Sequence, residues 1–342
     1  KLTSPTTVQI GGEQISCKSI ILATGSEPVS LPFLPFDEKR VVSSTGALSF
    51  SSPPKTLLVI GAGVIGVELG SVYSRLGTKV EFIEFFDHIC PTLDRSLSKE
   101  LQKILTSQGL QFHLSSKVTV AEISSNEVLL RFGEKETRSA EKVLVAIGRR
   151  AYTKELGLEN VGISVDSKGT IAVDRQFRTQ VPSIFAIGDL IDGPMLAHKA
   201  SEEGVAVAEI LAGKEPVVEY TAIPNVVYTH PEVAAVGLTE EEVKKYALSY
   251  KTGLFSFRSN SRAKCAREEE GFVKIIAEEK TDRILGVHII GAHASELITP
   301  AVFALKKKMT SKELAEMPFA HPTLSEALKE AALDVHKQAI HK

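Results

Sequence analysis

The sequence predicts an α/β protein followed by a carboxyl-terminal α+β domain. A buried apolar strand at 57–60 runs through a glycine-rich turn into a helix, which is the pattern of a β–α unit in a parallel sheet. Other apolar strands that end in glycine recur along the first two thirds of the chain. From about Thr221 onward, strands alternate with polar segments, which indicates a separate α+β domain.

Length, charge and cysteine content narrow the class of protein. A chain of 342 residues exceeds one ordinary core, so more than one domain is expected. The net charge of −2 predicts no nucleic-acid partner. No apolar run approaches the roughly 20 residues of a membrane span, and neither a membrane partner nor a targeting segment is predicted. Cys17, Cys90 and Cys265 lack metal-ligand and redox-pair spacing, which predicts reduced intracellular thiols and no metal site.

The first 52 residues are rich in predicted strands. Short strands on either side of the turn Gly11–Gly12 are typical of a β-hairpin over 7–17. The apolar run 19–26 predicts a buried strand that reaches a turn at Thr24 and Gly25. The functional interpretation puts the backbone N–H groups of this turn near a nucleotide, and a plain core strand is the alternative.

The strongest motif is Gly61-x-Gly63-x-x-Gly66, directly after the strand at 57–60. The first glycine permits a tight turn, the second lets the backbone approach a pyrophosphate, and the third lets the helix pack closely on the strand. The following helix is predicted to end at Gly77. We expect phosphates at the free N–H groups where this helix begins.

A carboxylate completes this motif about 20 residues further on. The second strand, 79–84, ends in Glu84, which is positioned to accept hydrogen bonds from ribose hydroxyls. Its charge would repel a 2′-phosphate, which favours NAD over NADP. The alternative is a plain strand–turn–helix unit with a solvated Glu84.

Further elements are predicted along the next hundred residues. Asp94 is expected to cap a helix over 95–108, and alternating residues over 118–132 predict a β-meander. The buried strand 142–149 reaches Gly148. Because ligands lie at the carboxyl ends of strands in such sheets, Gly148 is a candidate second contact to a dinucleotide.

A second candidate site lies at 179–189. An apolar strand again ends in glycine, and Gly188 is followed by the carboxylate of Asp189. Asp189 suits a ribityl or ribose chain, and an equally good interpretation is that it stabilises a turn. A helix over 197–211 follows.

The last informative segment is His321-Pro322-Thr323-Leu324-Ser325-Glu326. The pattern Thr323-x-x-Glu326 predicts a capping box that opens a helix over 324–338. The alternative is functional: Glu326 orients the imidazole of His321 and raises its basicity, so that it acts as a base at neutral pH. A further helix is predicted at about 297–307.

Five motifs, taken together and in order, resemble the dihydrolipoamide dehydrogenase family of pyridine nucleotide-disulfide oxidoreductases. The motifs are residues 23–26 (ATGS), 61–68 (GAGVIGVE), 186–189 (AIGD), 228–234 (YTHPEVA) and 321–326 (HPTLSE). The resemblance covers the whole chain. It implies four segments: the remainder of an FAD domain at 1–52, an NAD domain at 53–151, a segment returning to the FAD domain at 152–220, and an interface domain at 221–342. The implied fold is a partial Rossmann-like FAD domain, a Rossmann-like NAD domain and an α+β dimerisation domain.

The resemblance also implies which residues contact each cofactor. The residues implied for FAD are Thr24, Gly25, Gly188, Asp189, Met195, Leu196, Ala197 and His198. The residues implied for NAD are Gly61, Gly63, Val64, Gly66, Glu84 and Gly148, with Glu68 reaching toward the nicotinamide.

Members of this family oxidise protein-bound dihydrolipoamide and pass electrons through a cysteine disulfide and FAD to NAD⁺. By resemblance, His321 deprotonates the dihydrolipoamide thiol and Glu326 orients it. The dyad enters the active site of the opposite subunit, so a homodimer through 221–342 is expected. The implied partners are the lipoyl domains of 2-oxo-acid dehydrogenase complexes, with a role in glycine cleavage as well. The implied compartment is bacterial cytoplasm or mitochondrial matrix.

The chain departs from the family pattern in one respect. The family's first G-x-G-x-x-G and its Cys-x-x-x-x-Cys disulfide are not among these residues, and the chain begins at Lys1 rather than methionine. We therefore predict a piece of a longer enzyme that is inactive alone. The alternatives are a non-catalytic NAD-binding, dimerising module, or a related flavin reductase of the glutathione, trypanothione or mercuric type.

Overall fold

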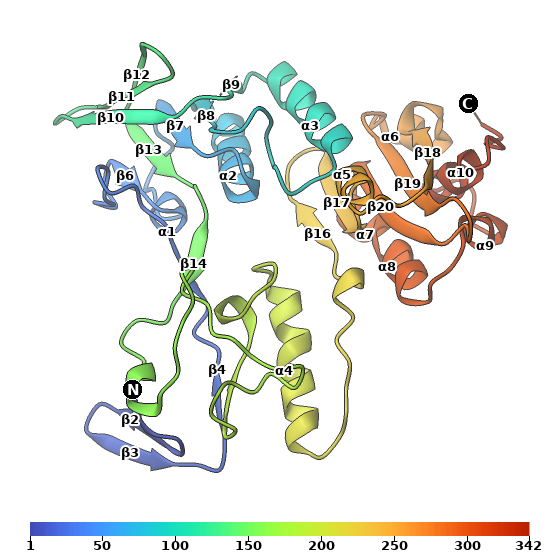
Figure 1. Cartoon of the computed structure of the whole chain (residues 1–342). Coiled ribbons are helices and arrows are strands. Elements are labelled where there is room, and N and C mark those ends of the chain that lie inside the picture. Colours follow the sequence, from blue (N-terminus) through green and yellow to red (C-terminus); the bar gives the residue numbers. More distant parts are fainter. Residues whose placement is uncertain (342) are drawn as a thin grey trace. The chain divides into compact units, whose positions relative to one another are not determined.

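The structure is a computed structural model that describes residues 1–341, and it contains two compact units (Figure 1). The first unit combines Lys1–Val29 with Gly148–Tyr220, and the second combines Ser30–Ile147 with the chain from Thr221 onward. The boundaries of these units differ from the predicted boundaries at 52 and 151. The strand at 41–42 pairs with 143–144 in the second unit, and the strand at 149–151 pairs with 26–28 in the first. The assignment of four functional domains stays a prediction.

The first unit is built from short strands and one long helix. The predicted hairpin is present, and a third strand extends it: β1 (Leu2–Ser4), β2 (Thr7–Ile10) and β3 (Glu13–Ser16). Two pairs of strands follow, one parallel and one antiparallel: β4 (Ile20–Leu22) with β15 (Ile184–Ala186), and β5 (Ser26–Pro28) with β14 (Arg149–Ala151). The helix α4 (Ala197–Leu211) has the predicted bounds.

One predicted strand of this unit is shorter than expected. The run 19–26 forms β4 over three residues only, and Gly25 has a φ of +72°. The strand ends at Leu22, and the left-handed conformation of Gly25 turns the backbone just before β5 begins at Ser26.

The second unit contains the main parallel sheet. Its strand order is β6-β13-β7-β8-β9, and every neighbouring pair is parallel. The strands are β6 (Val41–Val42), β13 (Lys142–Val145), β7 (Thr56–Ile60), β8 (Lys79–Ile83) and β9 (Gln111–His113). Residues 30–52 belong here because β6 forms an edge of this sheet. The predicted meander consists of β10 (Val118–Ile123), β11 (Val128–Phe132) and a third strand, β12 (Glu136–Ala140).

Three helices accompany the strands of this sheet, and two of them have sequence features that mark where they begin or end. They are α1 (Ser44–Ala47), α2 (Val64–Arg75) and α3 (Arg95–Ser107). Asp94 caps α3 as predicted, since its carboxylate accepts a hydrogen bond from the Ser96 N–H at 3.0 Å. Gly77 and Gly109, which follow α2 and α3, have φ values of +92° and +98° and allow the chain to leave each helix.

The carboxyl-terminal part of this unit is an antiparallel sheet with helices, as predicted. The strand order is β16 (Asn225–Val227), β17 (Glu232–Gly237), β20 (Ile284–Gly291), β19 (Phe272–Glu278) and β18 (Tyr250–Ser256). Its helices are α5 (Glu240–Lys245), α6 (Ser261–Ala266), α7 (Ala294–Leu297), α8 (Thr299–Lys306), α9 (Ser311–Glu316) and α10 (Glu326–Asp334). Short 3₁₀ turns occur in both units: η1 (Leu158–Val161) and η2 (Gly188–Leu190) in the first, η4 (Phe257–Ser259) in the second, and η3 (Tyr220–Ala222) where the chain passes from one to the other.

One of the two helix predictions in this part was wrong in extent. The helix expected at about 297–307 is present as α8, with Pro300 in its first turn, and the separate short helix α7 precedes it. Proline disfavours helical geometry in the residue before it and is tolerated mainly in the first helical turn. The helix expected over 324–338 is the shorter α10, and Lys337 beyond its end has a φ of +59°.

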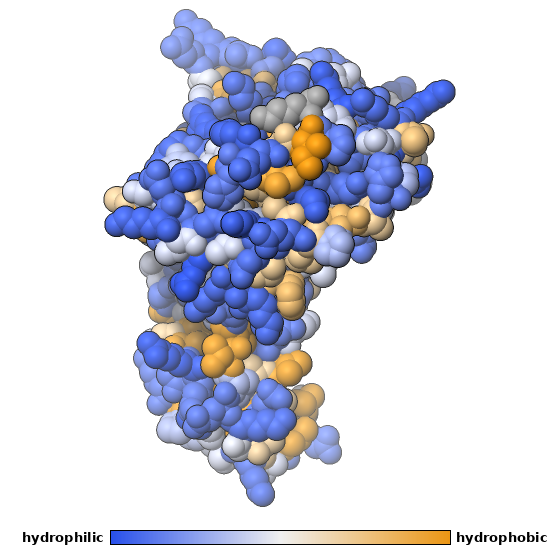
Figure 2. Space-filling view, turned by 90° about the vertical axis from the view of Figure 1, so that its right-hand side faces the viewer, coloured by the Kyte–Doolittle hydropathy of each residue, from blue (hydrophilic) through white to orange (hydrophobic). Residues whose placement is uncertain are grey.

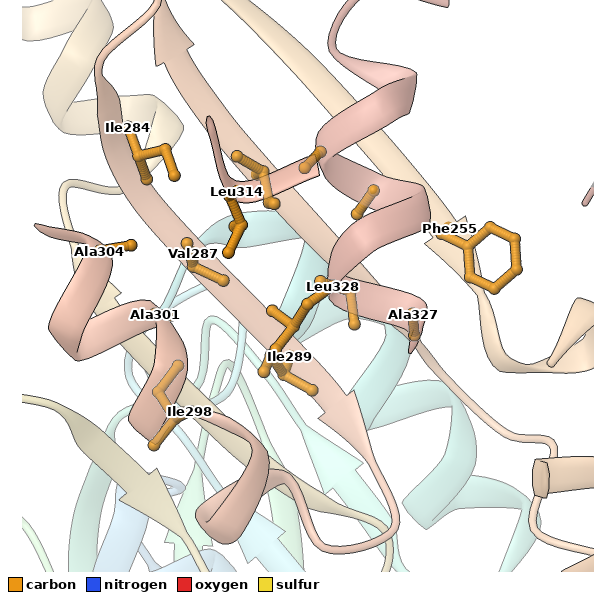
Figure 3. Close-up of a cluster of buried hydrophobic side chains, with 14 of the residues drawn as sticks. Phe255, Ile284, Val287, Ile289, Ile298, Ala301, Ala304, Leu314, Ala327 and Leu328 are labelled. Atoms are coloured by element: carbon orange, nitrogen blue, oxygen red, sulfur yellow. The ribbon is translucent and has the colours of Figure 1, made fainter. Parts of the chain in front are cut away.

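The core of the carboxyl-terminal sheet holds α10 in position. Leu328 of α10 and Ile289 of β20 lie in one cluster of fully buried apolar side chains (Figure 3). Burial of such a side chain contributes about 1.5–3 kcal/mol, so α10 is a rigid support for the groups at its first turn. On the face in Figure 2, by contrast, hydrophobic residues form small groups between larger hydrophilic areas.

A buried ion cluster joins α3 to this sheet. The Lys274 ammonium group on β19 donates to both carboxylate oxygens of Asp94, at 2.9 and 2.8 Å, and to Glu240 at 2.7 Å. The Glu240 N–H also donates to Asp94 at 3.0 Å, and Asp94 is completely buried. The cluster holds one cation and two carboxylates, so loss of Lys274 would leave the fully buried Asp94 without a compensating charge.

A buried histidine lies beside this cluster. The Nε2 atom of His288 is 3.0 Å from the Leu238 carbonyl oxygen, and burial lowers the pKa of the imidazole. Within residues 1–341, the other ring nitrogen of His288 has no hydrogen-bond partner. A neutral ring with its proton on Nε2 fits these surroundings, because it donates to the carbonyl and carries no buried charge.

Candidate dinucleotide sites and a histidine–glutamate pair

The glycine-rich turn between β7 and α2 allows very close backbone packing. Gly61 has a φ of +95°, and a Cβ atom there would lie 2.5 Å from the Ala146 carbonyl oxygen. A Cβ atom on Gly66 would lie 2.2 Å from the Gly61 carbonyl oxygen. Gly63 faces open space at the point where α2 begins with Val64, since a Cβ atom on Gly63 would meet nothing within 4 Å. The turn therefore has the form of a cradle for a phosphate at a helix N-terminus.

Glu84 closes this turn from the next strand. Its carboxylate accepts hydrogen bonds from the Ala62 N–H, in the middle of the turn, and from the Phe86 N–H at 2.8 Å. Glu84 is 5% exposed. The interpretation of Glu84 as a solvated surface residue was therefore wrong, since the carboxylate is buried and fixes the shape of the turn.

Glu68, one turn into α2, connects the parallel-sheet region to the carboxyl-terminal sheet. Its carboxylate accepts a hydrogen bond from the Tyr228 N–H at 2.7 Å. Burial raises the pKa of Glu68, and this hydrogen bond offsets only part of the effect. This hydrogen bond therefore joins the segment 228–234 to the glycine-rich segment 61–68.

Arg95, the first residue of α3, forms an ion pair with Asp87, which lies four residues after the end of β8. Arg95, from the start of α3, donates to both carboxylate oxygens of Asp87, and His88 contacts the same carboxylate. Hydrogen bonds from Arg95 and then His88 lower the pKa of Asp87 to about 2.

Gly148 lies in the first unit, at the start of the pair β14–β5. It has a φ of +129°, and its carbonyl oxygen accepts from the Val29 N–H at 3.0 Å. A positive φ at this turn explains the glycine locally.

Thr24 and Gly25 also bond within the first unit. The Thr24 hydroxyl donates to the Tyr152 carbonyl oxygen at 2.7 Å, and the Gly25 carbonyl oxygen accepts from the Tyr152 N–H at 2.8 Å. Both residues therefore fix the turn after β4 against the segment after β14.

Gly188 is held by a buried ion pair that sequence analysis missed. Its N–H donates to Glu203 at 2.7 Å, and its carbonyl oxygen accepts from the Lys199 ammonium at 3.0 Å. Lys199 and Glu203 pair at 3.0 Å with both side chains fully buried, and the Tyr220 hydroxyl donates to Glu203 at 2.8 Å. Burial and this carboxylate raise the pKa of Tyr220. The i,i+4 spacing on α4 was visible in the sequence, but such pairs are usually solvated.

Asp189 has a protein partner in this structure. Its carboxylate accepts from the Ser26 hydroxyl, which in turn accepts from Arg149 Nε at 2.7 Å. The chain of contacts supports the interpretation in which Asp189 stabilises a turn, and it leaves a carboxylate oxygen available for a ligand contact as well.

The remaining candidates of the first unit lie where α4 begins. Leu196 is the N-cap of α4 and makes no side-chain capping bond, and Ala197 and His198 form its first turn after Met195. The large cavity of this unit, about 1220 Å³, is lined by residues from 164–177 and 191–220, and none of the predicted site residues lines it. The cavity is therefore separate from the predicted contacts.

The histidine–glutamate pair is formed. His321 Nδ1 lies 2.9 Å from Glu326 Oε1, and the His321 side chain is 70% exposed. Burial opposes ionisation of Glu326, but hydrogen bonds from the Thr323 N–H and from His321 outweigh it and lower the pKa of Glu326. An ionised Glu326 fixes the proton of His321 on Nδ1 and leaves Nε2 as an exposed acceptor.

The predicted capping box is only half present. Glu326 does accept from the Thr323 N–H at 2.8 Å, but the Thr323 hydroxyl donates to the Ala320 carbonyl oxygen at 2.7 Å instead of capping the helix. Because α10 begins at Glu326 with Ser325 as its N-cap, Glu326 is the first helical residue rather than the third.

Other chemistry is limited in the described part of the chain. Among residues 1–341, Cys17, Cys90 and Cys265 are free thiols, and burial followed by the charges of Glu68 and Glu84 raises the pKa of Cys90 to about 12. The same residues include no group of three or more histidine, cysteine or acidic side chains arranged to hold a metal ion. None of their helices combines the length and apolarity needed to cross a bilayer.

Comparison with known proteins agrees with this arrangement. The sequence profile described as "pyridine nucleotide-disulphide oxidoreductase" matches residues 1–204, and that family's dimerisation domain matches 223–332. The chain is 48% identical to dihydrolipoyl dehydrogenase 1, mitochondrial, of Arabidopsis thaliana, across all of this chain and 69% of that protein. It is 49% identical to dihydrolipoyl dehydrogenase 3 of Pseudomonas putida, across 95% of this chain and 71% of that protein. The fold matches the HOCl-induced flavoprotein disulfide reductase RclA of Escherichia coli with a TM-score of 0.89 and 26% identity, over 97% of this chain and 77% of that one.

Proposed function

This chain belongs to the pyridine nucleotide-disulphide oxidoreductase family, and from that membership we propose how its residues serve a dihydrolipoyl dehydrogenase. Relatives at about 48% identity carry that name, so the reaction type is NAD-dependent flavoprotein disulfide oxidation and reduction. The observation that carries the residue-level proposal is the His321–Glu326 contact with its exposed imidazole.

The turn after β7 is proposed to bind NAD. Gly61 and Gly66 give the backbone its close packing, and the open space over Gly63 at the start of α2 fits a pyrophosphate. Glu84 would exchange part of its bonding to the turn for ribose hydroxyls. Val64 opens the helix, Gly148 is proposed as a second contact, and Glu68 is proposed to reach toward the nicotinamide.

Removal of the charge of Glu84 tests whether this residue recognises the nucleotide. Glu84→Gln keeps the size of the side chain and removes its charge. We expect NADH binding to weaken by about tenfold, the worth of one hydrogen bond to a charged group, and the preference for NADH over NADPH to narrow. Titration of both nucleotides into the chain measures this.

The control for this variant is Glu122→Gln on β10, where an exposed carboxylate pairs with Arg131 at 2.9 Å. That change is expected to leave both affinities unaltered. An unchanged nucleotide preference in Glu84→Gln would contradict the proposed role.

The first unit is proposed to contribute one half of an FAD site. Gly188 offers a turn whose backbone is fixed by Lys199 and Glu203, and Asp189 retains acceptor capacity toward a ribityl hydroxyl. Thr24, Gly25 and the segment 195–198 are proposed as the other contacts. When bound, FAD and NAD⁺ supply the electron and hydride acceptors of the reaction.

His321 is proposed as the catalytic base. Its Nε2 atom accepts the proton of the dihydrolipoamide thiol, because the thiolate rather than the thiol reacts with a disulfide. Glu326 holds the opposite ring proton on Nδ1 and stabilises the imidazolium that forms. Glu326 is held in position for this role, because α10 packs on the core of its sheet.

The assembly is proposed to be a homodimer through 221–342, supported by the dimerisation-domain match. Lipoyl domains of 2-oxo-acid dehydrogenase complexes are the proposed protein partners. Relatives from a plant mitochondrion and from Pseudomonas support the mitochondrial matrix or the bacterial cytoplasm as the proposed compartment.

Activity is proposed to need a redox disulfide in addition to these residues. The three free cysteines include one buried thiol of high pKa, and none pairs with another among residues 1–341. The purified 342-residue chain is therefore expected to catalyse no dihydrolipoamide-dependent reduction of NAD⁺. It is expected to bind NADH and to have the molecular mass of a dimer in solution. Turnover by the chain alone would overturn the proposed need for the disulfide, whereas a monomer that ignores NADH would overturn the NAD and dimer proposals.

A further inference from the structure

A chain of hydrogen bonds joins the strand β14 to the 3₁₀ turn η2 within the first unit. Arg149, the first residue of β14, donates from Nε to the Ser26 hydroxyl oxygen at 2.7 Å and from Nη2 to the Ser26 carbonyl oxygen at 2.6 Å. The Ser26 hydroxyl donates in turn to Asp189 in η2. Two donors of the guanidinium group are therefore directed at one residue, and that residue contacts the carboxylate proposed to bind FAD.

The register of β5 and β14 places Arg149 beside Ser26. In this antiparallel pair, Ser26 lies opposite Ala151 and Pro28 lies opposite Arg149. Because alternate residues of a strand share a face, Arg149 and Ser26 are diagonal neighbours on the same face of the pair. The pairing of the strands thus fixes the backbone on both sides of the contact, and the Arg149 side chain orders only itself and the Ser26 hydroxyl.

The donors and acceptors of this chain allow only one direction. A guanidinium group has donors and no acceptor, so the Ser26 oxygen accepts from Arg149 and the Ser26 proton is left for Asp189. That proton occupies Oδ2 of Asp189, and Oδ1 is the oxygen that can accept from a ligand. The backbone before Asp189 is held as well, since the Gly188 N–H donates to the buried Glu203 at 2.7 Å.

We propose that Arg149 and Ser26 are positioning residues for Asp189 and strengthen the binding of the ribityl chain of FAD. The inference rests on the proposed function, in which Asp189 accepts a hydrogen bond from a ribityl hydroxyl. A carboxylate that is already held in one orientation loses less conformational freedom when a ligand binds than one that rotates. Arg149 fixes the direction of the Ser26 proton, and Ser26 fixes the half-buried carboxylate so that Oδ1 stays free for a hydroxyl donor.

The test is the affinity for FAD of the flavin-free enzyme that carries the redox disulfide, measured by the change in flavin fluorescence on binding. In Arg149→Gln and in Ser26→Ala we expect the Kd for FAD to rise about 2- to 10-fold, the fold-change that corresponds to the net worth of one hydrogen bond. Arg149→Lys keeps a donor for the Ser26 hydroxyl and is expected to bind FAD more tightly than Arg149→Gln.

Two further measurements separate positioning from a general loss of structure. If Arg149 acts through Ser26, the double variant Ser26→Ala, Arg149→Gln binds FAD as tightly as Ser26→Ala alone, whereas independent effects would multiply. An FAD analogue without ribityl hydroxyls is expected to bind the unmodified enzyme and Arg149→Gln equally well, because it has no donor for Asp189. Multiplied effects in the double variant, or an equal loss of affinity for FAD and for the analogue, overturn the inference.

The matched control is Arg150→Gln, at the next position of β14. The Arg150 guanidinium group donates to Glu27 at 2.7 Å, so its loss removes an arginine contact between the same two strands. This variant is expected to bind FAD with an unchanged Kd. A rise in Kd as large as that in Arg149→Gln would contradict the positioning role, because loss of either arginine of β14 would then disturb the site.

Asp189→Asn separates this inference from the proposed function. The Ser26 proton needs an acceptor, so the asparagine is expected to keep its oxygen toward Ser26 and to turn its NH₂ group toward the ligand. If Asp189→Asn bound FAD as tightly as the unmodified enzyme, the proposed FAD contact of Asp189 would fail, and the inference with it. Weak binding in Asp189→Asn together with normal binding in Arg149→Gln and Ser26→Ala would overturn the inference alone.

Discussion

Replacing His321 by glutamine is expected to lower dihydrolipoamide oxidation by about 100- to 10,000-fold in the enzyme that carries the redox disulfide. Glutamine keeps a polar side chain of similar size but cannot accept the thiol proton at neutral pH. The loss should appear mainly in kcat, because proton removal belongs to the chemical step rather than to substrate binding. Steady-state kinetics with dihydrolipoamide and NAD⁺ measures both constants.

Two comparisons isolate this effect. Reduction of an electron-accepting dye by NADH involves no thiol proton, so it is expected to continue at the normal rate in His321→Gln. His336→Gln, which removes an imidazole paired with Asp282 elsewhere in the same domain, is expected to change dihydrolipoamide oxidation less than about twofold. A His321→Gln enzyme with more than a tenth of normal turnover would rule out the proposed base.

Replacing Lys274 by methionine is expected to destabilise the second unit by about 3–5 kcal/mol. Lys274 compensates Asp94, which is fully buried at the start of α3, and Glu240 at the start of α5. Methionine fills the space but leaves both carboxylates without their shared cation. Urea denaturation and hydrogen exchange of the α3 amides measure the loss of stability.

The control for Lys274→Met is Lys103→Met, on α3 itself. Lys103 pairs with Glu100 at 2.9 Å, but its side chain is 69% exposed, so its loss is expected to cost less than about 1 kcal/mol. Equal effects of the two variants would mean that the buried cluster does not hold α3 to the carboxyl-terminal sheet.

The same cluster predicts an acid limit to stability. Burial opposes ionisation of Glu240, but hydrogen bonds from Lys244, Lys274 and Tyr250 outweigh it and lower the pKa to about 2 from the ordinary 4.5. Burial likewise opposes ionisation of Asp94, but hydrogen bonds from Lys274, from Ser96 and from the Glu240 N–H outweigh it and hold the pKa of Asp94 far below the usual range. Because both folded-state pKa values are depressed, this stability is fully present above about pH 4.5 and is lost as the pH falls toward 2. In Lys274→Met, acid unfolding should begin at a higher pH.

Elements whose physical causes lie within a few residues can be predicted from the sequence. The strand, the Gly61-x-Gly63-x-x-Gly66 turn and α2 follow from apolar runs and from backbone conformations that glycine permits. The Asp94 cap and the bounds of α4 were likewise readable, because helix ends are decided by neighbouring residues. The His321–Glu326 contact is of this kind, since the partners are only five positions apart in the sequence.

Which charged groups are buried, and which distant segments meet, depends on how the whole chain packs. The i,i+4 spacing of Lys199 and Glu203 on α4 is typical of a solvated ion pair. In the structure both side chains are buried, and Glu203 accepts hydrogen bonds from Gly188 and Tyr220. The pairing of β6 with β13 in the parallel sheet joins segments that are far apart along the chain. The contact of residues 340–341 with Glu330 forms because the chain reverses direction after α10. Periodicity and local spacing describe one segment at a time, whereas burial of a charge depends on every segment packed around it.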